Sequence, residues 1–246
     1  MIPNRFAKSS NWFKFSAEFR LCQESRRKTE IGLVFHCLRN KGFLFLLLIL
    51  ILSCKTYDTS ILENGDFLFV TISETGLSDA INNVTQTEKK TSYDHIAIVE
   101  KEKKTFYVLH AAPKGGSQKQ KLNSFIKEQT KSGQKIDIYR LKPEFRFAIP
   151  NSLLKAESLL GKSYNFNYLL NDNSYYCSDF VEHAFRDFKI FQLEPMTFID
   201  PKTGKTNLFW KKFYSEKNLK VPEGEPGCNP NGLAASDKIA KVGKLK

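Results

Sequence analysis

Two apolar runs separated by a short charged segment constrain the fold of this 246-residue chain more than any other feature. The runs YDHIAIVE (93–100) and TFYVLHAA (105–112) are rich in β-branched and aromatic residues, which favour strands. The residues between them (101–104, KEKK) are all charged, as expected of an exposed turn. The pattern predicts an antiparallel β-hairpin in which successive side chains point to opposite faces.

The predicted hairpin brings two histidines together. If residues 101–104 form the loop, His95 lies directly opposite His110, with Cβ atoms about 5 Å apart. The other residues on that face are apolar, namely Ala97, Val99, Phe106 and Val108. Asp94 points to the opposite face and is a poor partner for His95. Two buried imidazoles are costly without partners or a function, so both a structural and a catalytic pair remain open.

Other segments with strand or helix patterns surround the hairpin. The runs GDFLFV (65–70) and KIDIYRL (135–141) predict strands. Residues 122–133 and 149–161 predict helices that end at glycines, and KGGSQKQK (114–121) predicts a flexible loop. Antiparallel strands mixed with helices, without an internal repeat, predict a single α+β domain.

The net charge of +12 is not evidence for nucleic-acid binding. Residues 1–53 carry nine Lys or Arg and three Asp or Glu, so half of the excess charge lies in this N-terminal segment. In the remainder Lys and Glu are interspersed, without the basic stripe typical of a nucleic-acid interface. We therefore expect no nucleic-acid partner, and the composition does not indicate an oligomeric state.

The five cysteines have neither the paired spacing of a zinc site nor the density of a disulfide framework. They are Cys22, Cys37, Cys54, Cys177 and Cys228. The chain also lacks a phosphate-binding loop, a dinucleotide fingerprint and an HExxH motif. We expect neither a metal nor a cofactor.

Residues 39–54 have the layout of a bacterial export signal. Arg39 and Lys41 precede an apolar run of ten residues (43–52), too short for a bilayer-spanning helix of about 20 residues but suited to a signal peptide. The run leads through a serine to Cys54, an order that resembles the bacterial lipobox. Two acyl chains on Cys54 would hold the mature protein on an envelope membrane, outside the cytoplasm. The alternative is a short membrane-associated helix with a chance cysteine.

This interpretation divides the chain into four parts. Residues 1–53 form the signal region, and residues 1–37 are too long and too acidic for its basic start, which suggests a later translation start. Residues 54–61 form the lipidated N-terminus and a linker. Residues 62–215 form the folded domain, and residues 216–246 form a Pro-, Gly- and Lys-rich tail.

Cys177 precedes a segment with helical spacing of apolar residues. The pattern predicts an amphipathic helix from Cys177 to about Phe188, with the thiol at its N-terminus on the buried side. There the helix dipole and free N–H groups can lower a thiol pKa from about 8.5 and can bind an oxyanion. With a neighbouring imidazole this is an activated nucleophile. A buried structural thiol is the alternative, and His183 lies off this face.

Six segments, in order, resemble the YiiX-like cysteine hydrolases, which are permuted papain-fold amidases of the NlpC-type superfamily. The segments are GDFLFV, LSDAINNVT, YDHIAIVE, VLHAAPKGG, GKSYNF and YYCSDFVEHAF, and they cover about residues 62 to 190. The histidine precedes the cysteine, the reverse of papain, as expected of a permuted chain. The resemblance implies an α+β, permuted papain-like fold with a small antiparallel sheet or barrel packed against the nucleophile helix.

The resemblance also implies roles for individual residues. Cys177 matches the nucleophile, His95 the general base, and His110 the third polar residue, where many members have Glu. Tyr164 and Tyr176 are candidates for the oxyanion hole or substrate pocket, although packed aromatics would look the same. The implied reaction is hydrolysis of a peptide, cell-wall or N-acyl amide through a thioester.

Two other functions remain open. Relatives in the superfamily act on lipid acyl groups, and the aromatic cluster NLFWKKFY (207–214) could contact lipid, which allows a lipid-directed acyl hydrolase or acyltransferase. A lipoprotein that keeps the fold but only binds is also possible. The presence of all three catalytic-type side chains argues against it.

Overall fold

A computed structural model of the chain describes residues 57–73 and 76–245. The predicted signal region and Cys54 lie outside the described residues. No helix within the described residues is both long enough and apolar enough to cross a membrane.

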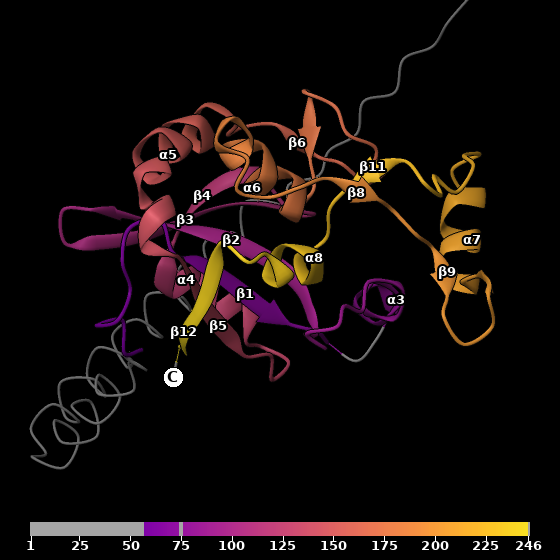
Figure 1. Cartoon of the computed structure of the whole chain (residues 1–246), viewed down its shortest axis with the longest axis horizontal. Helices are drawn as coiled ribbons and strands as arrows, with labels where there is room; N and C mark the ends of the chain where they lie inside the picture. The colour runs from indigo at the N-terminus through magenta and orange to yellow at the C-terminus, as the bar shows by residue number, and fades with distance from the viewer. Residues whose placement is uncertain (1–56, 74–75, 246) are drawn as a thin grey trace, which may run out of the picture. The chain divides into compact units, whose positions relative to one another are not determined.

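A six-stranded antiparallel sheet lies at the centre, with strand order β12-β5-β1-β2-β3-β4 (Figure 1). Its strands are β1 (Phe67–Thr71), β2 (Tyr93–Glu102), β3 (Thr105–Ala112), β4 (Gly116–Lys121), β5 (Ile136–Leu141) and β12 (Ile239–Lys244). Strands β1 to β4 follow one another in the chain and in the sheet. The C-terminal strand β12 therefore completes the opposite edge.

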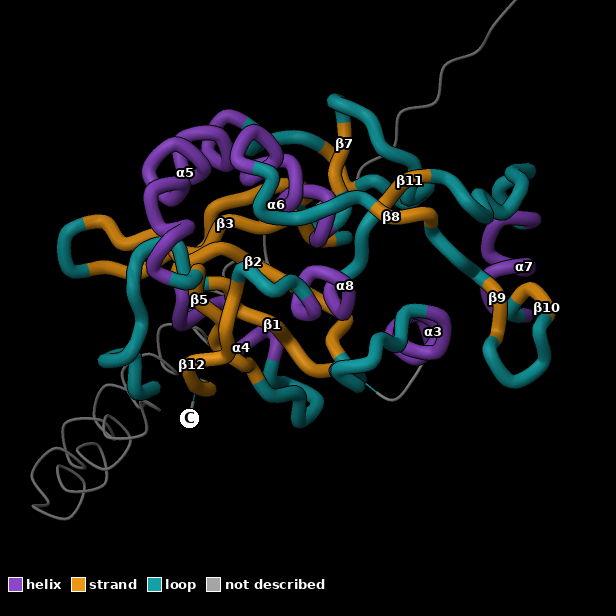
Figure 2. The backbone as a smooth tube through the Cα atoms, in the orientation of Figure 1, coloured by secondary structure: helices purple, strands orange, loops and turns teal. Residues whose placement is uncertain are grey.

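Helices and short strand pairs surround the sheet (Figure 2). The helices are α3 (Gly76–Val84), α4 (Leu122–Gln129), α5 (Ile149–Ser158), α6 (Cys177–Phe185), α7 (Leu208–Ser215) and α8 (Pro230–Ala235), with 3₁₀ helices η1 (Pro143–Ala148) and η2 (Arg186–Phe188). The short pairs are β6 (Ser163–Tyr164) with β7 (Ser174–Tyr175), β8 (Glu194–Pro195) with β11 (Pro226–Gly227), and β9 (Ile199–Asp200) with β10 (Lys205–Thr206).

Alternation along the strands gives the sheet two buried faces. On β1, Phe67 and Phe69 belong to one core, whereas Leu68 and Val70 belong to the other. Helices α5, α6 and α8 contribute to the first core, and α4, with the fully buried Phe125, contributes to the second. Burial of each of these large side chains stabilises the fold by roughly 1.5–3 kcal/mol.

The hairpin forms as predicted, but its register differs from the predicted one by two residues. Glu102 pairs with Thr105, so the turn contains only residues 103–104. A two-residue turn suits the twist of paired strands better than a longer loop. Because the shift is even, His95 and His110 stay on one face, although they are not directly opposed.

Two segments that we predicted as irregular belong to the sheet. Residues 114–121 include β4, a polar edge strand paired with β3. The predicted tail, 216–246, supplies β11, α8 and β12, and β12 pairs with β5. Pairing with a neighbouring strand outweighs the weak strand tendency of these sequences, because most of what favours a strand is its tertiary surroundings.

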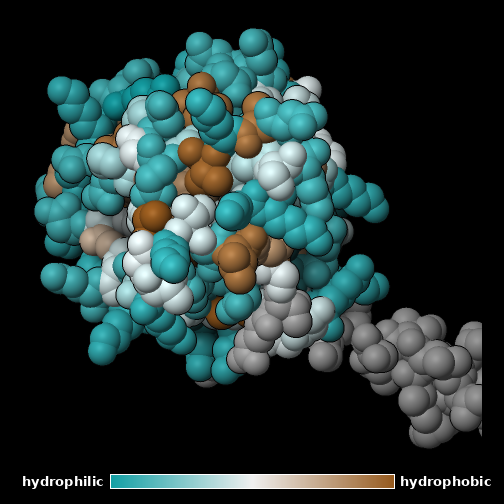
Figure 3. Space-filling model, turned by 90° about the vertical axis from the view of Figure 1, so that its right-hand side faces the viewer, coloured by the Kyte–Doolittle hydropathy of each residue, from teal (hydrophilic) through white to brown (hydrophobic). Residues whose placement is uncertain are grey.

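The face that carries α3 and α7 presents small groups of hydrophobic residues among hydrophilic ones (Figure 3). The most exposed large apolar side chain of the described residues is Leu208, the first residue of α7, at 82%. Apolar residues scattered in this way are ordinary on a protein surface. This face alone therefore identifies no binding partner.

Candidate active site

Cys177 is the first residue of α6, as the helical spacing predicted. The preceding residue, Tyr176, has an extended backbone, with φ −94° and ψ 172°. The apolar face of the helix packs into the core beside the sheet, and its Phe185 ring lies 5.1 Å from that of Phe67. Only 6% of Cys177 is exposed.

The thiol lies against the backbone of β2 at the point where β2 and β3 separate. The recorded pairs between these strands end at Ile98 and Leu109. Beyond that pair, Cys177 Sγ lies 3.8 Å from the carbonyl oxygen of Asp94 and is hydrogen-bonded by the backbone N–H of Ile96. The N-terminus of α6 therefore occupies the gap that the separating strands leave.

His95 lies between those two backbone groups, and its side chain contacts His110. The Nε2 atom of His95 is 3.0 Å from Nδ1 of His110, and the rings meet edge to face with centroids 5.2 Å apart. Both rings also contact Phe125 of α4. The structure thus brings together the two histidines that the hairpin pattern predicted to meet.

Cys177 and His95 approach the gap from opposite sides. Cys177 belongs to the core that contains α6, whereas the His95 ring packs on α4. The structure records no hydrogen bond between Sγ and either imidazole, and Nδ1 of His95 has no hydrogen bond in the described part of the chain. Transfer of a proton from Cys177 to His95 therefore requires Nδ1 of His95 to face the gap between β2 and β3.

Burial sets the protonation of these groups. Burial, and next the neighbouring His110, lower the pKa of His95 well below its ordinary 6.5, and burial lowers the pKa of His110 to about 4. Burial and then the Asp94 carboxylate raise the pKa of Cys177 to about 12, against the opposing effect of the Ser178 N–H. This differs from the lowered thiol pKa that we expected at a helix N-terminus. At the helix terminus the loss of hydration outweighs the favourable amides, so the resting thiol and imidazoles are neutral.

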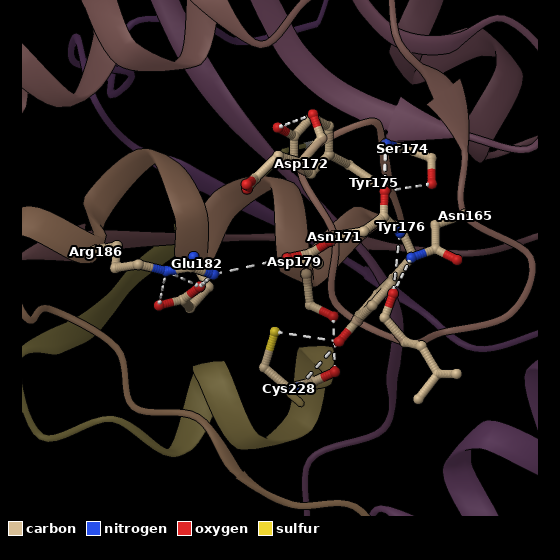
Figure 4. Close-up of polar contacts among 12 residues, drawn as sticks. Asn165, Asn171, Asp172, Ser174, Tyr175, Tyr176, Asp179, Glu182, Arg186 and Cys228 are labelled. Carbon is tan, nitrogen blue, oxygen red and sulfur yellow. Dashed lines mark hydrogen bonds and ion pairs between the residues drawn. The ribbon is translucent and has the colours of Figure 1, made fainter. Parts of the chain in front are cut away.

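The two tyrosines predicted for the site, Tyr164 and Tyr176, contact different parts of the protein. The backbone N–H of Cys177 donates to the hydroxyl of Tyr164, whose pKa burial raises well above its ordinary value. The Tyr176 hydroxyl instead accepts from the backbone N–H of Cys228 at 3.2 Å and lies 3.8 Å from its Sγ (Figure 4). Tyr176 therefore joins α6 to the C-terminal segment.

A cavity of about 590 Å³ opens beside Cys177. Its walls combine apolar residues, which include Tyr164, Tyr168, Phe191, Met196, Phe198, Trp210 and Leu233, with polar ones, which include Asp94, Gln192 and Lys238. Neither histidine is among the described residues that line it. Most of the wall comes from residues after 189, which no sequence pattern connected with the site. Only the aromatic cluster at 207–214 could have indicated Trp210.

Two buried carboxylates of α6 interact with Arg186, the residue that follows this helix (Figure 4). Arg186 is 2.5 Å from Glu182 and 4.0 Å from Asp179, and both carboxylates are almost fully buried. Burial raises the pKa of Asp179 to about 7, because the distant Arg186 compensates only in part. These groups connect the first and last turns of the helix.

The chain matches, over residues 61–243, the model of the family described as permuted papain-like amidase enzymes, YaeF/YiiX, C92 family. The chain belongs to this family. A crystal structure described as that of metalloprotein yiiX from Escherichia coli O157:H7 is similar, with a TM-score of 0.57 and 22% identity, over 74% of this chain and 97% of that one. No curated protein matches this chain.

Family membership confirms the permuted papain-like fold and the class of papain-like amidase or cysteine hydrolase. The solved relative is described as a metalloprotein, and one group of acidic side chains in this chain has the spacing of a metal site. Among the described residues, Glu100, Glu102 and Glu157 have oxygen atoms within 4.8 Å of one another. The Lys119 ammonium group already lies 2.5 to 3.0 Å from all three. Because the Lys119 ammonium group already occupies the position between these oxygen atoms, the donor set does not fit a resident metal.

Proposed function

We propose that this protein is a cysteine amidase in which Cys177 is the nucleophile, His95 the general base, and His110 the residue that orients His95. One observation carries the proposal. The Cys177 thiol lies at the N-terminus of a buried helix, against the backbone on both sides of His95. The His95 ring is in turn held by His110 through the 3.0 Å contact.

Because the Cys177 thiol and the His95 imidazole are both neutral before the substrate binds, a proton must move from one to the other during the reaction. His95 accepts the thiol proton through Nδ1 as the sulfur attacks the substrate carbonyl carbon, because a free thiolate is costly at this depth. The backbone N–H of Cys177, which holds the Tyr164 hydroxyl in the resting protein, donates to the developing oxyanion once the substrate carbonyl displaces that hydroxyl. His95 then protonates the leaving amine. A water molecule, deprotonated by His95, hydrolyses the thioester and restores the thiol.

The proposed substrate is an amide with an apolar portion. A peptide, a cell-wall peptide and an N-acyl amine all meet this description. A cavity of about 590 Å³ with mainly apolar walls is within the size range of small-molecule sites, roughly 300–1,000 Å³. The same walls favour a second candidate, a lipid-directed acyl hydrolase or acyltransferase. Purified protein assayed against both acyl esters and peptide amides separates the two.

The central experiment is labelling with an electrophilic probe, followed by mapping of the modified cysteine. We expect the probe to modify Cys177 and to leave Cys228, an equally buried thiol, unmodified. Unlabelled Cys177 combined with retained ligand binding would favour a non-catalytic binding protein. Modification of Cys228 alone would contradict the assignment.

Substitutions test the three roles. Cys177→Ala and His95→Ala should each abolish hydrolysis, because nucleophilic and general-base catalysis contribute factors of about 100 or more. His110→Ala should lower kcat by roughly 100-fold, the scale of a misplaced catalytic group. Cys228→Ala is the matched control. Equal loss of folded structure in all three variants, measured by circular dichroism, would instead indicate a structural cluster.

We also propose that Cys54 carries lipid and anchors the protein to a membrane of the bacterial envelope. The support is the order of basic residues, apolar run, serine and cysteine in the sequence. Cys54→Ser should release the protein from the membrane fraction and prevent incorporation of labelled palmitate. A peptide from residues 1–30 in the mature cellular protein would contradict the proposed processing.

A further inference from the structure

A chain of polar side chains leads from His110 to the surface of α4. The register pairs His110 with Gln118 and Val108 with Gln120, so Gln120 is the diagonal neighbour of His110 on the same face. Gln120 Nε2 donates to Glu128 Oε2 at 3.0 Å. Glu128 belongs to α4 and is exposed.

Two buried polar atoms in this series of side chains need hydrogen-bond partners. His110 Nε2 and Gln120 Oε1 are buried, and neither has a partner of good geometry among the described residues. The Gln120 side chain nevertheless lies near enough to His110 to raise the pKa of His110 against the larger effect of burial. Buried polar groups are rarely left unpaired, so each of these two atoms is the expected partner of the other.

Each side chain in this series of hydrogen bonds determines the orientation or the tautomer of the next one. A carboxylate only accepts, so Glu128 turns the amide nitrogen of Gln120 toward itself and leaves Oε1 for His110. That acceptor requires the proton of His110 to be on Nε2, which makes its Nδ1 an acceptor. The 3.0 Å contact then requires His95 to donate from Nε2. Nδ1 of His95 is left with a lone pair.

We propose that Gln120 and Glu128 are positioning residues that select the tautomers of His110 and, through it, of His95. The selected tautomer leaves the basic nitrogen of His95 free to take the Cys177 proton. The inference rests on the proposed function only for this last step. With the opposite tautomers His95 would carry its proton on Nδ1 and could not act as a base for Cys177.

The tautomer of His110 can be measured at pH 7.5 because the groups around this ring leave it neutral at that pH. His95 faces it from β2, Glu128 from α4 and Lys114 from the β3–β4 turn, and the last two line a cavity of about 290 Å³ with His110. Cys177, on α6, is neutral at rest. Since burial lowers the pKa of His110 to about 4, both rings are neutral at pH 7.5 and differ only in tautomer.

The experiment is nitrogen NMR of the full chain with ¹⁵N-labelled histidine at pH 7.5. The chain has only four histidines, so the ring nitrogens can be assigned with single variants. We expect His95 and His110 both to carry the proton on Nε2. A proton on Nδ1 of His110 in the unmodified protein would overturn the inference.

Variants of Gln120 separate positioning from stability. Gln120→Leu should give mixed tautomers and lower kcat about tenfold with little change in KM, the scale of one lost hydrogen bond. Gln120→Glu combined with Glu128→Gln reverses the donor and acceptor of this pair, keeps an acceptor oxygen for His110, and should restore the tautomer and most of the activity. Glu128→Gln no longer dictates the amide orientation and should give an intermediate mixture.

Gln118→Leu is the matched control, because Gln118 lies on the same face of β4 but donates to the Lys114 carbonyl oxygen. It should change neither the tautomers nor kcat. Unchanged tautomers in Gln120→Leu would overturn the inference. The expected tautomers in a protein whose Cys177 is unreactive would support the chain of hydrogen bonds and overturn the proposed function instead.

Discussion

Two opposing effects act on the pKa of the Cys177 thiol. A helix N-terminus stabilises an anion by roughly 0.3–1 kcal/mol, and up to about 2 kcal/mol in buried geometries. Removing the thiol from water acts in the other direction, and the pKa of Cys177 rises to about 12. Burial therefore prevails, and Cys177 and His95 need substrate present before a proton moves between them.

The pH dependence of hydrolysis tests this neutral pair. His95 accepts a proton only when it is neutral, and its pKa is lowered in the folded protein. Activity should therefore be full at pH 6.5, the ordinary histidine pKa, and fall only as the pH drops further through the lowered pKa. Measurement of kcat/KM from pH 4 to pH 10 checks this.

Alkylation of Cys177 provides the companion measurement. Without substrate, the rate of reaction with iodoacetamide should still increase above pH 9, because the thiol pKa is near 12. A rate that is already constant from pH 7 upward would show a resting thiolate. That result would contradict the neutral pair.

At the scale of elements, the junction between β4 and β6 holds one wall of the cavity. Gly116, which begins β4, has a φ of +66°, and a Cβ atom there would lie 2.0 Å from the carbonyl oxygen of Lys162. The next residue, Ser117, donates its N–H to that same oxygen at 2.9 Å. Two residues after Lys162, Tyr164 lines the cavity. The glycine is therefore required for both conformation and close approach.

We predict that Gly116→Ala is more destabilising than Gly133→Ala. Both glycines have a positive φ, which costs an alanine about 1–2 kcal/mol, but no atom lies within 4 Å of the Cβ position at Gly133. The backbone clash at Gly116 should bring its cost to about 3 kcal/mol or more, beyond the usual effect of one substitution. Denaturant unfolding of the two variants checks the difference. Equal losses would contradict the role of the junction.

At the scale of the whole molecule, the C-terminal segment is part of the sheet and of the cavity. Strand β12 covers the edge of β5 and buries Ile239, and Leu245 donates its N–H to the Ile136 carbonyl oxygen. Helix α8 contributes the buried Leu233 to the cavity wall. Strand β12 therefore forms one edge of the sheet, and α8 forms part of the cavity wall.

A chain truncated after Ser236 should be much less stable than the full chain. It loses the β12 pairing and the burial of Ile239, together on the order of 3–5 kcal/mol, which lowers Tm by roughly 10 °C in a protein of this size. Thermal unfolding followed by circular dichroism checks the prediction. Removal of Lys246 alone is the control. An unchanged Tm after truncation would mean that these residues are a tail after all.

The local sequence was sufficient to predict the hairpin, its histidine-bearing face and the helix that begins at Cys177. Each depends on periodicity over a few residues, and an even shift in register leaves the faces unchanged. The order of the motifs was also sufficient to indicate the family.

Only the tertiary structure decided the depth of Cys177, the path of the C-terminal segment and the partners of His110. A pKa depends on how much water the whole fold removes, which no segment specifies. The polar sequences of β4 and β12 become strands because β3 and β5 offer them unpaired edges. Gln120 and Glu128 reach His110 only once β4 and α4 lie beside β3, contacts that form between residues distant in the sequence.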